Sequence, residues 1–317
     1  MNPSPAPDSV LTLTDLVGWS HPGPALAVLG HPIKHSVSPA MHNAALAAMA
    51  RAEPRFAAWK YFRFDVPPER LPEALPQFHA AGFHGLNLTV PHKVLAVDLI
   101  KEIDPGAATI GAVNTLRRTT DGWRGYNTDG YGLATALRHE LAVNLTGTQV
   151  VLLGAGGAAR GAAVECLQRG CSSLWIANRT QANLDHLLAA LRPLAGVTTL
   201  HGFDPAAPPP GISAGAVVVN ATSSGLKSGE PPPIALRRLP AGIKVYDMIY
   251  NPPQTALLRE AAALGLPHAN GLSMLVHQGA RSLGIWTGSD VPAEVMHTAA
   301  RAALGLSSSN GLTAPHS

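Results

Sequence analysis

The chain is poor in cysteine and contains no long apolar run, and each shortage argues against a class of protein. Its two cysteines, Cys166 and Cys171, cannot supply the disulfide framework of a small secreted protein, so we expect reduced thiols in a reducing compartment. No apolar run approaches the ~20 residues of a transmembrane helix. The N-terminus lacks the basic segment and apolar core of a secretory signal. We therefore expect a soluble, cytoplasmic protein that binds no membrane.

Charge of either sign is also scarce. The 23 Lys and Arg residues against 20 Asp and Glu residues give a formal net charge of +3, and no run of basic residues occurs. A nucleic-acid partner is therefore not expected. The 14 histidines are scattered without the spacing of a metal site, so we expect no metal. A Gly-x-Ser-x-Gly motif is absent, which disfavours a serine hydrolase.

What the sequence does contain is an alternation of apolar strands and helical segments. Its 317 residues, 46% of them hydrophobic, predict two domains. The first part favours strands over Ala25–Leu29, Trp59–Phe64 and Gly85–Val90, followed by a hairpin around Asp121–Gly122. The second part alternates strand and helix, which predicts a parallel sheet with right-handed crossovers. Its strands are expected at Val150–Leu153, Leu174–Ala177, Ala216–Val219, Ile243–Asp247 and near Leu266.

A glycine turn follows the first strand of this second part. The apolar run Val150–Leu153 predicts a strand buried on both faces. Gly154 permits a sharp turn, Gly156 lets a ligand approach the backbone, and Ala159 suits close packing of the next helix on the strand. The N–H groups at that helix start suit a pyrophosphate. The alternative is an ordinary turn between strand and helix that happens to use glycines.

The end of the next strand carries Asn178, Arg179 and Thr180. A site that prefers NAD usually has a carboxylate at this position to hold the ribose 2′-hydroxyl. An arginine with two polar neighbours instead suits a 2′-phosphate. The position therefore favours NADP(H) over NAD(H), and the alternative is a solvated arginine at a strand end.

Two serines, Ser36 and Ser38, lie in the loop after the first strand, close to the predicted start of a helix. Their hydroxyls could both reach one anionic or polar group, because strand ends of an open parallel sheet are where ligands bind. The alternative is that they cap the helix, which serine often does.

Polar residues also follow the later strands of the first part. Lys93 comes just after Asn87 and Thr89, and could act as a general acid toward a carbonyl oxygen. Asp129 could hold the ammonium group of Lys93, while Asn114 supplies a further polar side chain. Taken alone, Lys93 could equally be a surface lysine and Asp129 the N-cap of a helix.

Taken together, these loops resemble those of the shikimate dehydrogenase family. The resemblance extends from Ala25 to Leu306. It implies NADPH-dependent reduction of 3-dehydroshikimate to shikimate, within the synthesis of chorismate and the aromatic amino acids. The segments that carry it are Gly30–Asn43, Gly85–Lys93, Gly111–Thr115, Gly125–Asp129, Gly154–Gly161, Asn178–Thr180, Asn220–Gly225, Tyr246–Thr255 and Asn270–Gln278.

The resemblance also implies roles for individual residues. Lys93 and Asp129 would form the catalytic pair. The substrate would be held by Ser36, Ser38 and Tyr250 at its carboxylate and by Thr89, Asn114 and Gln278 at its ring oxygens. NADP(H) would contact Gly154, Ala155, Gly156, Gly157 and Ala158 at the pyrophosphate, Asn178, Arg179 and Thr180 at the 2′-phosphate, and Met248 and Gly271 at the nicotinamide.

Two positions depart from the family pattern. Asn183 stands where many relatives have a second arginine for the phosphate, and Gly279 replaces the usual alanine after Gln278. A quinate or dual quinate/shikimate dehydrogenase is the nearest alternative function. A non-catalytic protein that senses NADP(H) is a second alternative, although such a protein would need neither Lys93 nor Asp129.

The fold implied is α/β with two domains: an N-terminal α/β substrate domain and a Rossmann-type NADP-binding domain, with a C-terminal helix returning to the first. We expect the substrate domain at residues 25–130 plus 272–306 and the NADP-binding domain at 131–271. An N-terminal extension (1–24) and a disordered tail (307–317) would flank them. The resemblance leaves open whether the protein is a monomer or a homodimer.

Overall fold

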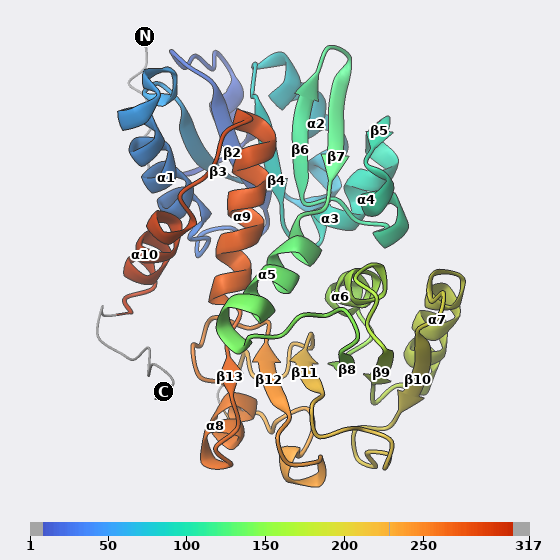
Figure 1. Cartoon of the computed structure of the whole chain (residues 1–317). Coiled ribbons are helices and arrows are strands. Elements are labelled where there is room, and N and C mark those ends of the chain that lie inside the picture. Colours follow the sequence, from blue (N-terminus) through green and yellow to red (C-terminus); the bar gives the residue numbers. More distant parts are fainter. Residues whose placement is uncertain (1–8, 228, 307–317) are drawn as a thin grey trace. The chain divides into compact units, whose positions relative to one another are not determined.

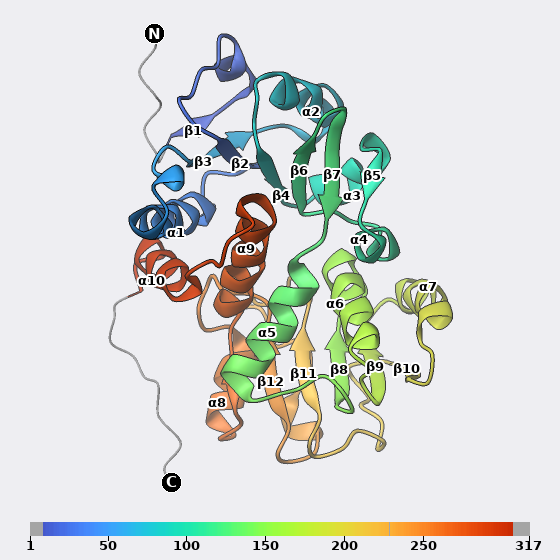
Figure 2. The ribbon, with the colours of Figure 1, turned by 45° about the horizontal axis from the view of Figure 1, so that its top comes forward.

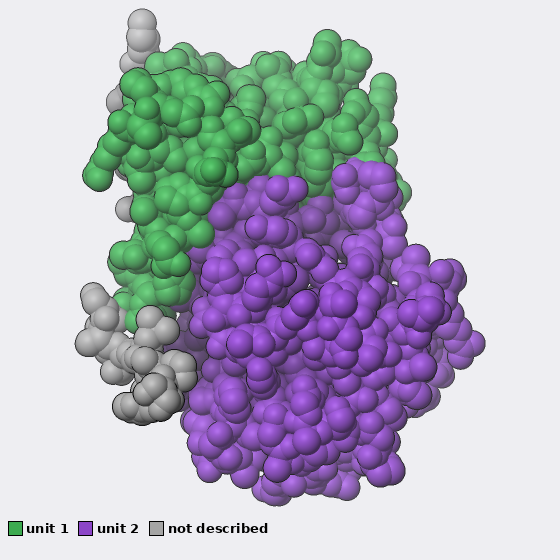
Figure 3. All heavy atoms as spheres, in the orientation of Figure 1, with its two compact units in different colours: residues 1–103, 113–126, 282–317 green, residues 104–112, 127–281 purple. Residues whose placement is uncertain are grey.

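The computed structural model describes residues 9–227 and 229–306, and its elements are labelled in Figure 1. The chain divides into two compact units, coloured separately in Figure 3. The first unit comprises the described residues within 1–103, 113–126 and 282–317, and the second those within 104–112 and 127–281. The predicted tail and the first eight residues of the predicted N-terminal extension lie outside the described residues.

The first unit is built on a seven-stranded mixed sheet with the order β1-β3-β2-β4-β6-β7-β5. Strands β1 to β4 are parallel, and the β6–β7 hairpin adds two antiparallel strands beside β4. All six residues of β2 are buried, as expected for a mostly apolar strand covered on both faces. The strands are β1 (Val10–Leu11), β2 (Ala25–Gly30), β3 (Lys60–Asp65), β4 (Gly85–Leu88), β5 (Glu102–Ile103), β6 (Thr115–Thr119) and β7 (Gly122–Tyr126).

Helices from both ends of the chain cover this sheet. The last helix, α10, packs against α1, and the two lie side by side in Figures 1 and 2. The C-terminal helix thus returns to the first unit, as predicted. The helices of the unit are α1 (Ser38–Ala52), α2 (Leu71–Ala80), α3 (His92–Leu95) and α10 (Ala293–Ala303), with 3₁₀ turns η1 (Leu13–Leu16), η2 (Pro54–Phe56), η3 (Pro68–Arg70) and η4 (Ala96–Leu99).

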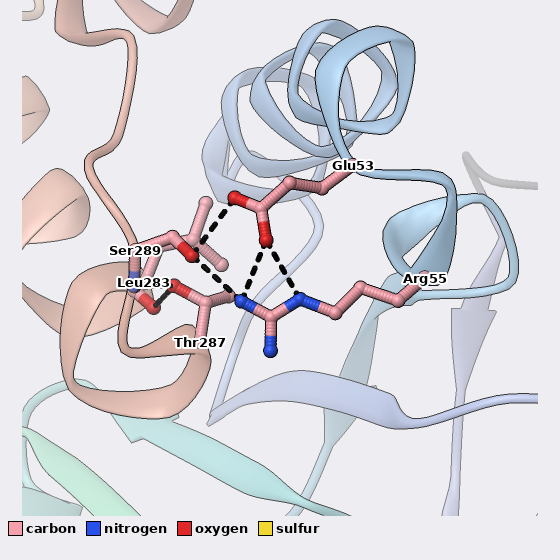
Figure 4. A network of polar contacts seen from close by, with 5 residues as sticks. All are labelled: Glu53, Arg55, Leu283, Thr287 and Ser289. Carbon is pink, nitrogen blue, oxygen red and sulfur yellow. Dashed lines mark hydrogen bonds and ion pairs between the residues drawn. The ribbon is translucent and has the colours of Figure 1, made fainter.

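A polar network ties the segment before α10 to the end of α1 (Figure 4). The Ser289 hydroxyl donates to Glu53 Oε1 at 3.1 Å and accepts from Arg55 Nη2 at 2.8 Å. Arg55 also donates to Glu53 through Nε at 2.8 Å. Single ion pairs at the surface contribute little, but a network that joins segments distant in sequence can fix the path of the chain.

The segment before β2 belongs to the core of the first unit. Strand β1 extends the sheet beyond β3, and the ring of Trp19 lies 5.1 Å from that of Phe62 and 5.0 Å from that of Phe83. Aromatic contacts of this kind stabilise a core beyond the area they bury. The described part of the predicted N-terminal extension is therefore integral to the sheet and its aromatic core.

The second unit contains a six-stranded parallel sheet in the order β10-β9-β8-β11-β12-β13. Numbered from β8, this is the order 3-2-1-4-5-6 of the doubly wound Rossmann fold, as predicted. The strand β10 was not predicted. The strands are β8 (Gln149–Leu153), β9 (Ser173–Ala177), β10 (Thr199–Phe203), β11 (Val217–Asn220), β12 (Lys244–Asp247) and β13 (His268–Ala269).

Alternating strand residues build two apolar layers on this sheet. Val150 and Leu152 belong to the layer shared with α5, α6 and α7, whereas Val151 and Leu153 belong to the opposite layer with α8. Both faces are covered, as a parallel sheet requires. The helices are α4 (Pro105–Ile110), α5 (Asp129–Leu141), α6 (Gly157–Gln168), α7 (Gln181–Leu191), α8 (Ala256–Ala263) and α9 (Leu272–Thr287), with η5 (Arg192–Leu194) and η6 (Leu236–Arg238).

The units differ from the predicted domains at their edges. Residues 104–112 fall in the second unit because α4 packs against α6, and Ile110 lies in the same apolar cluster. Helix α5 and the first part of α9 also belong there. At Gly132 an added Cβ would come within 2.7 Å of the carbonyl of Met274, so these helices are in close contact. The chain returns to the first unit inside α9, between Arg281 and Ser282.

Candidate active site

In the first unit, candidate residues follow the carboxyl ends of β2 and β4. The Thr89 amide donates to Leu29 O at 3.1 Å. The Thr89 methyl packs against Gly30, where an added Cβ would lie only 2.3 Å from it. Lys93, in α3, is half-buried. Its amide donates to Thr89 O at 3.3 Å, and its carbonyl oxygen accepts from the Val113 amide at 2.8 Å. The backbone of Lys93 is therefore fixed independently of its side chain.

Neither serine of the β2–α1 loop is the N-cap of the helix. The N-cap of α1 is Val37, which makes no side-chain capping hydrogen bond, and Ser38 is the first helical residue. The Ser36 hydroxyl accepts from the Ser38 amide at 3.3 Å, so it satisfies one N–H of the helix start. The Ser38 hydroxyl hydrogen-bonds the hydroxyl of Tyr61. Capping thus accounts for part of the role of Ser36 and none of the role of the Ser38 side chain.

Asn114 precedes β6 and is held on several sides. Its backbone N–H donates to Tyr126 O at 2.9 Å, and its side-chain Oδ1 accepts from the Thr115 hydroxyl at 2.9 Å. Asn87 donates to Asn114 O, also at 2.9 Å. Asn114 is buried, with only 2% of its surface exposed.

In the second unit, Asp129 is the first residue of α5, and its N-cap is Thr128. The Asp129 amide donates to Asn127 Oδ1 at 3.0 Å. The Thr128 hydroxyl donates to Gln278 Oε1 at 3.4 Å, so the chain brings Gln278 of α9 to the start of α5. Asp129 therefore does not serve as the N-cap. Lys93 belongs to the first unit, and its pairing with Asp129 remains a proposal.

The glycine turn after β8 has the geometry of a phosphate cradle. Gly154 has φ +111°, which side-chain-bearing residues rarely adopt, and its amide donates to Ala177 O at 2.8 Å. A Cβ on Gly156 or Gly157 would meet nothing within 4 Å, so packing within the protein does not require glycine there. No protein atom packs against these two glycines at the start of α6, and the residues there fit a pyrophosphate.

The loop after β9 carries the predicted 2′-phosphate residues. Arg179 and Thr180 are exposed, whereas the Asn178 side chain donates to Thr180 O at 2.8 Å and so shapes the turn. Sequence reasoning missed a neighbour of Arg179. Glu230, in the loop after β11, interacts electrostatically with Arg179, and its Oε2 accepts from the Gly225 amide at 2.8 Å. That hydrogen bond is the largest cause of the lowered pKa of Glu230.

A buried carboxylate holds the loop after β12. Asp247 Oδ1 accepts from Asn220 Nδ2 at 2.9 Å and from the Ile249 amide at 3.0 Å, and Oδ2 accepts from the Thr255 hydroxyl at 2.6 Å. Burial raises the pKa of Asp247, and these three hydrogen bonds oppose the shift. The network fixes the segment that leads to Met248 and Tyr250.

Gly271 has a packing reason to be glycine. A Cβ there would lie 2.0 Å from the carbonyl of Met248, and the Gly271 amide donates to Ile249 O at 3.1 Å. The structure therefore brings Met248 and Gly271, the two residues predicted at the nicotinamide, into direct contact. Tyr250, two residues beyond Met248, is half-buried, and burial raises its pKa.

The described residues contain neither a cluster of metal-ligating side chains nor a membrane-spanning helix. Within 9–227 and 229–306, no group of three or more His, Cys, Asp or Glu side chains could hold a metal ion. No helix in the same ranges is long and apolar enough to cross a membrane.

The doubly wound sheet with its glycine turn, together with the strand-end lysine and serines of the first unit, defines a two-unit α/β dehydrogenase. Two family models match the chain: the shikimate dehydrogenase substrate binding domain over residues 28–116 and the shikimate 5'-dehydrogenase C-terminal domain over residues 271–301. The shikimate dehydrogenase (NADP(+)) of Methanopyrus kandleri is 39% identical over 277 residues, 86% of this chain and 93% of that protein. The chain belongs to the shikimate dehydrogenase family, as its motifs predicted.

Solved structures agree with this placement. The shikimate 5-dehydrogenase of Thermus thermophilus, in complex with NADP(H) and shikimate, is 36% identical with a TM-score of 0.75, covering 88% of this chain and 99% of that one. The ligand-free 5-ketofructose reductase of Gluconobacter sp. strain CHM43 is 30% identical with a TM-score of 0.78, covering 88% and 98%. The predicted fold class, an N-terminal substrate domain with a Rossmann domain, is confirmed.

Proposed function

We propose that the protein is an oxidoreductase that catalyses the reversible, NADP(H)-dependent reduction of 3-dehydroshikimate to shikimate. This reaction belongs to the synthesis of chorismate and the aromatic amino acids. The observation that carries the proposal is the 39% identity to a shikimate dehydrogenase (NADP(+)) over 93% of that protein. The match covers 86% of this chain and therefore includes residues of both units.

The residues of the first unit bind and protonate the substrate. Ser36 and Ser38, with Tyr250 of the second unit, hold the carboxylate, since hydroxyl donors suit an anion. The ammonium group of Lys93 donates a proton to the ketone oxygen as negative charge develops there. Asp129 holds that ammonium group and accepts a hydrogen bond from a substrate hydroxyl. Support comes from the fixed backbone of Lys93 and from the position of Asp129 at the start of α5 rather than at its N-cap.

The remaining proposed contacts orient the ring and the cofactor. Thr89, Asn114 and Gln278 contact the ring oxygens of the substrate. NADPH, when bound, supplies the hydride. The turn from Gly154 to Ala158 binds its pyrophosphate through backbone N–H groups, and Arg179 with Thr180 binds its 2′-phosphate. Met248 and Gly271 flank the nicotinamide.

The organisation around this chemistry is also proposed. The first unit acts as the substrate domain and the second as the NADP-binding domain, with α5 and α9 contributing Asp129 and Gln278. The protein acts on a small molecule in the cytoplasm, as a monomer or a homodimer.

A spectrophotometric assay tests the proposal. Purified protein should oxidise NADPH in the presence of 3-dehydroshikimate and reduce NADP(+) with shikimate. Quinate, 5-ketofructose and NADH serve as comparison reactants in the same assay. A higher kcat/KM for quinate would make the protein a quinate dehydrogenase. Binding of NADP(H) without any turnover would support a non-catalytic sensor.

A further inference from the structure

A chain of buried polar groups lies behind the proposed substrate residues of the first unit. It comprises Tyr61 of β3, Asn87 of β4, Thr115 of β6 and Ser282 of α9, each 6% exposed or less. Asn87 and Thr115 face each other as cross-strand partners in the sheet. No member of this chain belongs to the proposed site, yet buried polar groups of this kind are retained only when they are hydrogen-bonded.

The hydrogen bonds within the chain are short and continuous. The Tyr61 hydroxyl donates to Asn87 Oδ1 at 2.7 Å. Asn87 Nδ2 donates to Asn114 O at 2.9 Å and to the Thr115 hydroxyl at 3.1 Å. The hydroxyls of Thr115 and Ser282 lie 2.7 Å apart, and Thr115 donates to Asn114 Oδ1 at 2.9 Å.

The chemistry of the partners fixes the orientation of the Asn87 amide. A backbone carbonyl can only accept, so Asn87 must turn its Nδ2 toward Asn114 O and its Oδ1 toward Tyr61. The same Nδ2 also lies within hydrogen-bond distance of the hydroxyls of Thr115, at 3.1 Å, and Ser282, at 3.2 Å, and Thr115 donates to Asn114 Oδ1.

We propose that Thr115, held by Asn87 and Ser282, is a positioning residue that keeps Asn114 oriented as a hydrogen-bond donor toward an oxygen of the bound substrate. Because Oδ1 of Asn114 accepts from Thr115, the donor atom of the same amide, Nδ2, is held on the opposite side. The group recognised is therefore an acceptor, a carbonyl or hydroxyl oxygen of the substrate ring. This inference rests on the proposed function, since it assigns a direction to one contact of that site.

Thr115→Val tests the inference, because valine keeps the shape of threonine and removes the hydroxyl. The Asn114 amide then loses its orienting donor, and we expect KM for 3-dehydroshikimate to rise about 5- to 150-fold, the range for an unsatisfied buried partner. The kcat should change much less, and KM for NADPH should not change. Thr115→Ser, which keeps the hydroxyl, should restore KM to within about twofold of the wild-type value.

Two further variants separate positioning from a general loss of structure. Thr287→Val removes another buried hydroxyl of the first unit, one that donates to Leu283 O at 2.8 Å, and should leave KM unchanged. In an Asn114→Ala background, Thr115→Val should have no further effect on KM, because it acts through Asn114. An effect that persists in that background, or an unchanged KM in Thr115→Val itself, overturns the inference. Absence of turnover in the wild-type protein would instead overturn the proposed function and the inference with it.

Discussion

At the scale of single residues, Lys93 is the most direct test of the proposed chemistry. Its backbone is anchored to Thr89 and Val113, so Lys93→Ala removes the ammonium group without releasing the loop. Loss of a general acid typically lowers turnover by about a hundred-fold or more, and we expect kcat to fall on that scale while KM changes little. Steady-state kinetics with 3-dehydroshikimate and NADPH measure both constants. Lys101→Ala, an exposed lysine of the same unit, is the matched control. Near-normal turnover in Lys93→Ala would remove Lys93 from the mechanism.

The neighbouring residue, His92, predicts a pH dependence of stability. Its ring is fully buried, its Nε2 lies 2.7 Å from Val66 O, and burial is the main cause of its lowered pKa. The unfolded chain therefore takes up a proton near the ordinary pKa of 6.5, whereas the folded protein does so only at lower pH. The free energy of unfolding should be unaffected by this group above that pH and should decrease as the pH falls toward the folded pKa.

Urea unfolding between pH 8 and pH 5 measures this dependence. His92→Gln can still donate to Val66 O but cannot titrate, so the decrease toward acid pH should be smaller in the variant than in the wild type. His186→Gln, an exposed histidine on α7, controls for loss of an imidazole elsewhere. Parallel curves for wild type and His92→Gln would show that His92 does not couple folding to pH.

At the scale of elements, the loop after β9 determines the cofactor prediction. Arg179 is the sole cation between Asn178 and Asn183, and the carboxylate of Glu230 interacts with it. A charge-assisted hydrogen bond contributes about 1.5–3 kcal/mol, so Arg179→Ala should lower kcat/KM for NADPH roughly ten- to a hundred-fold. The value for NADH should stay nearly the same, because NADH has no 2′-phosphate.

Kinetics with both cofactors decide this point, and Arg192→Ala, an exposed arginine of the same unit, is the control. Equal kcat/KM for NADPH and NADH in the unmodified protein would mean that Asn178–Thr180 forms an ordinary strand end. A small preference would fit the asparagine at position 183 and the nearby Glu230, since neither adds positive charge to the site.

The strands that the sequence predicts best are those buried along most or all of their length. The central strands β2, β8 and β11 are buried along most or all of their length, and their apolar runs predicted them. Strand β10 was missed because it lies at the edge of the sheet and only Phe203 is buried, so its five residues lack both an apolar run and clear alternation. Weak patterns of this kind are overridden by tertiary context.

In the candidate site, residues at strand ends could be predicted from the sequence, whereas contacts between distant segments could not. Lys93, Ser38 and the glycine turn stand at strand ends, where the chain order alone predicts ligand contacts. The network behind Asn114 could not be predicted, because Tyr61, Thr115 and Ser282 come from three elements that are far apart in the sequence. Only the register of β4 on β6 and the packing of α9 bring their hydroxyls together.

At the scale of the whole molecule, the path of the chain couples the two units. The chain crosses between them after residues 103, 112, 126 and 281, and the last crossing lies inside the continuous helix α9. Trp286, in the last turn of α9, donates from Nε1 to Leu116 O at 2.9 Å within the first unit. Unfolding of the second unit therefore removes the start of a helix whose end belongs to the core of the first, and we expect one cooperative transition.

A ligand of the second unit should accordingly stabilise the first. Four of the five tryptophans belong to the first unit, and in a Trp175→Phe variant all remaining tryptophan fluorescence reports on it. We choose 2′,5′-ADP as ligand because it carries the 2′-phosphate and lacks the nicotinamide. At a hundred times its Kd, 2′,5′-ADP should stabilise the protein by about 2.7 kcal/mol, which corresponds to a rise in Tm of roughly 4 °C for a single transition of a chain of this length. At the same concentration 5′-AMP should raise Tm less, and Arg179→Ala should abolish the difference between the two ligands. Two separate transitions, with the fluorescence transition unmoved by 2′,5′-ADP, would show that α9 does not couple the units.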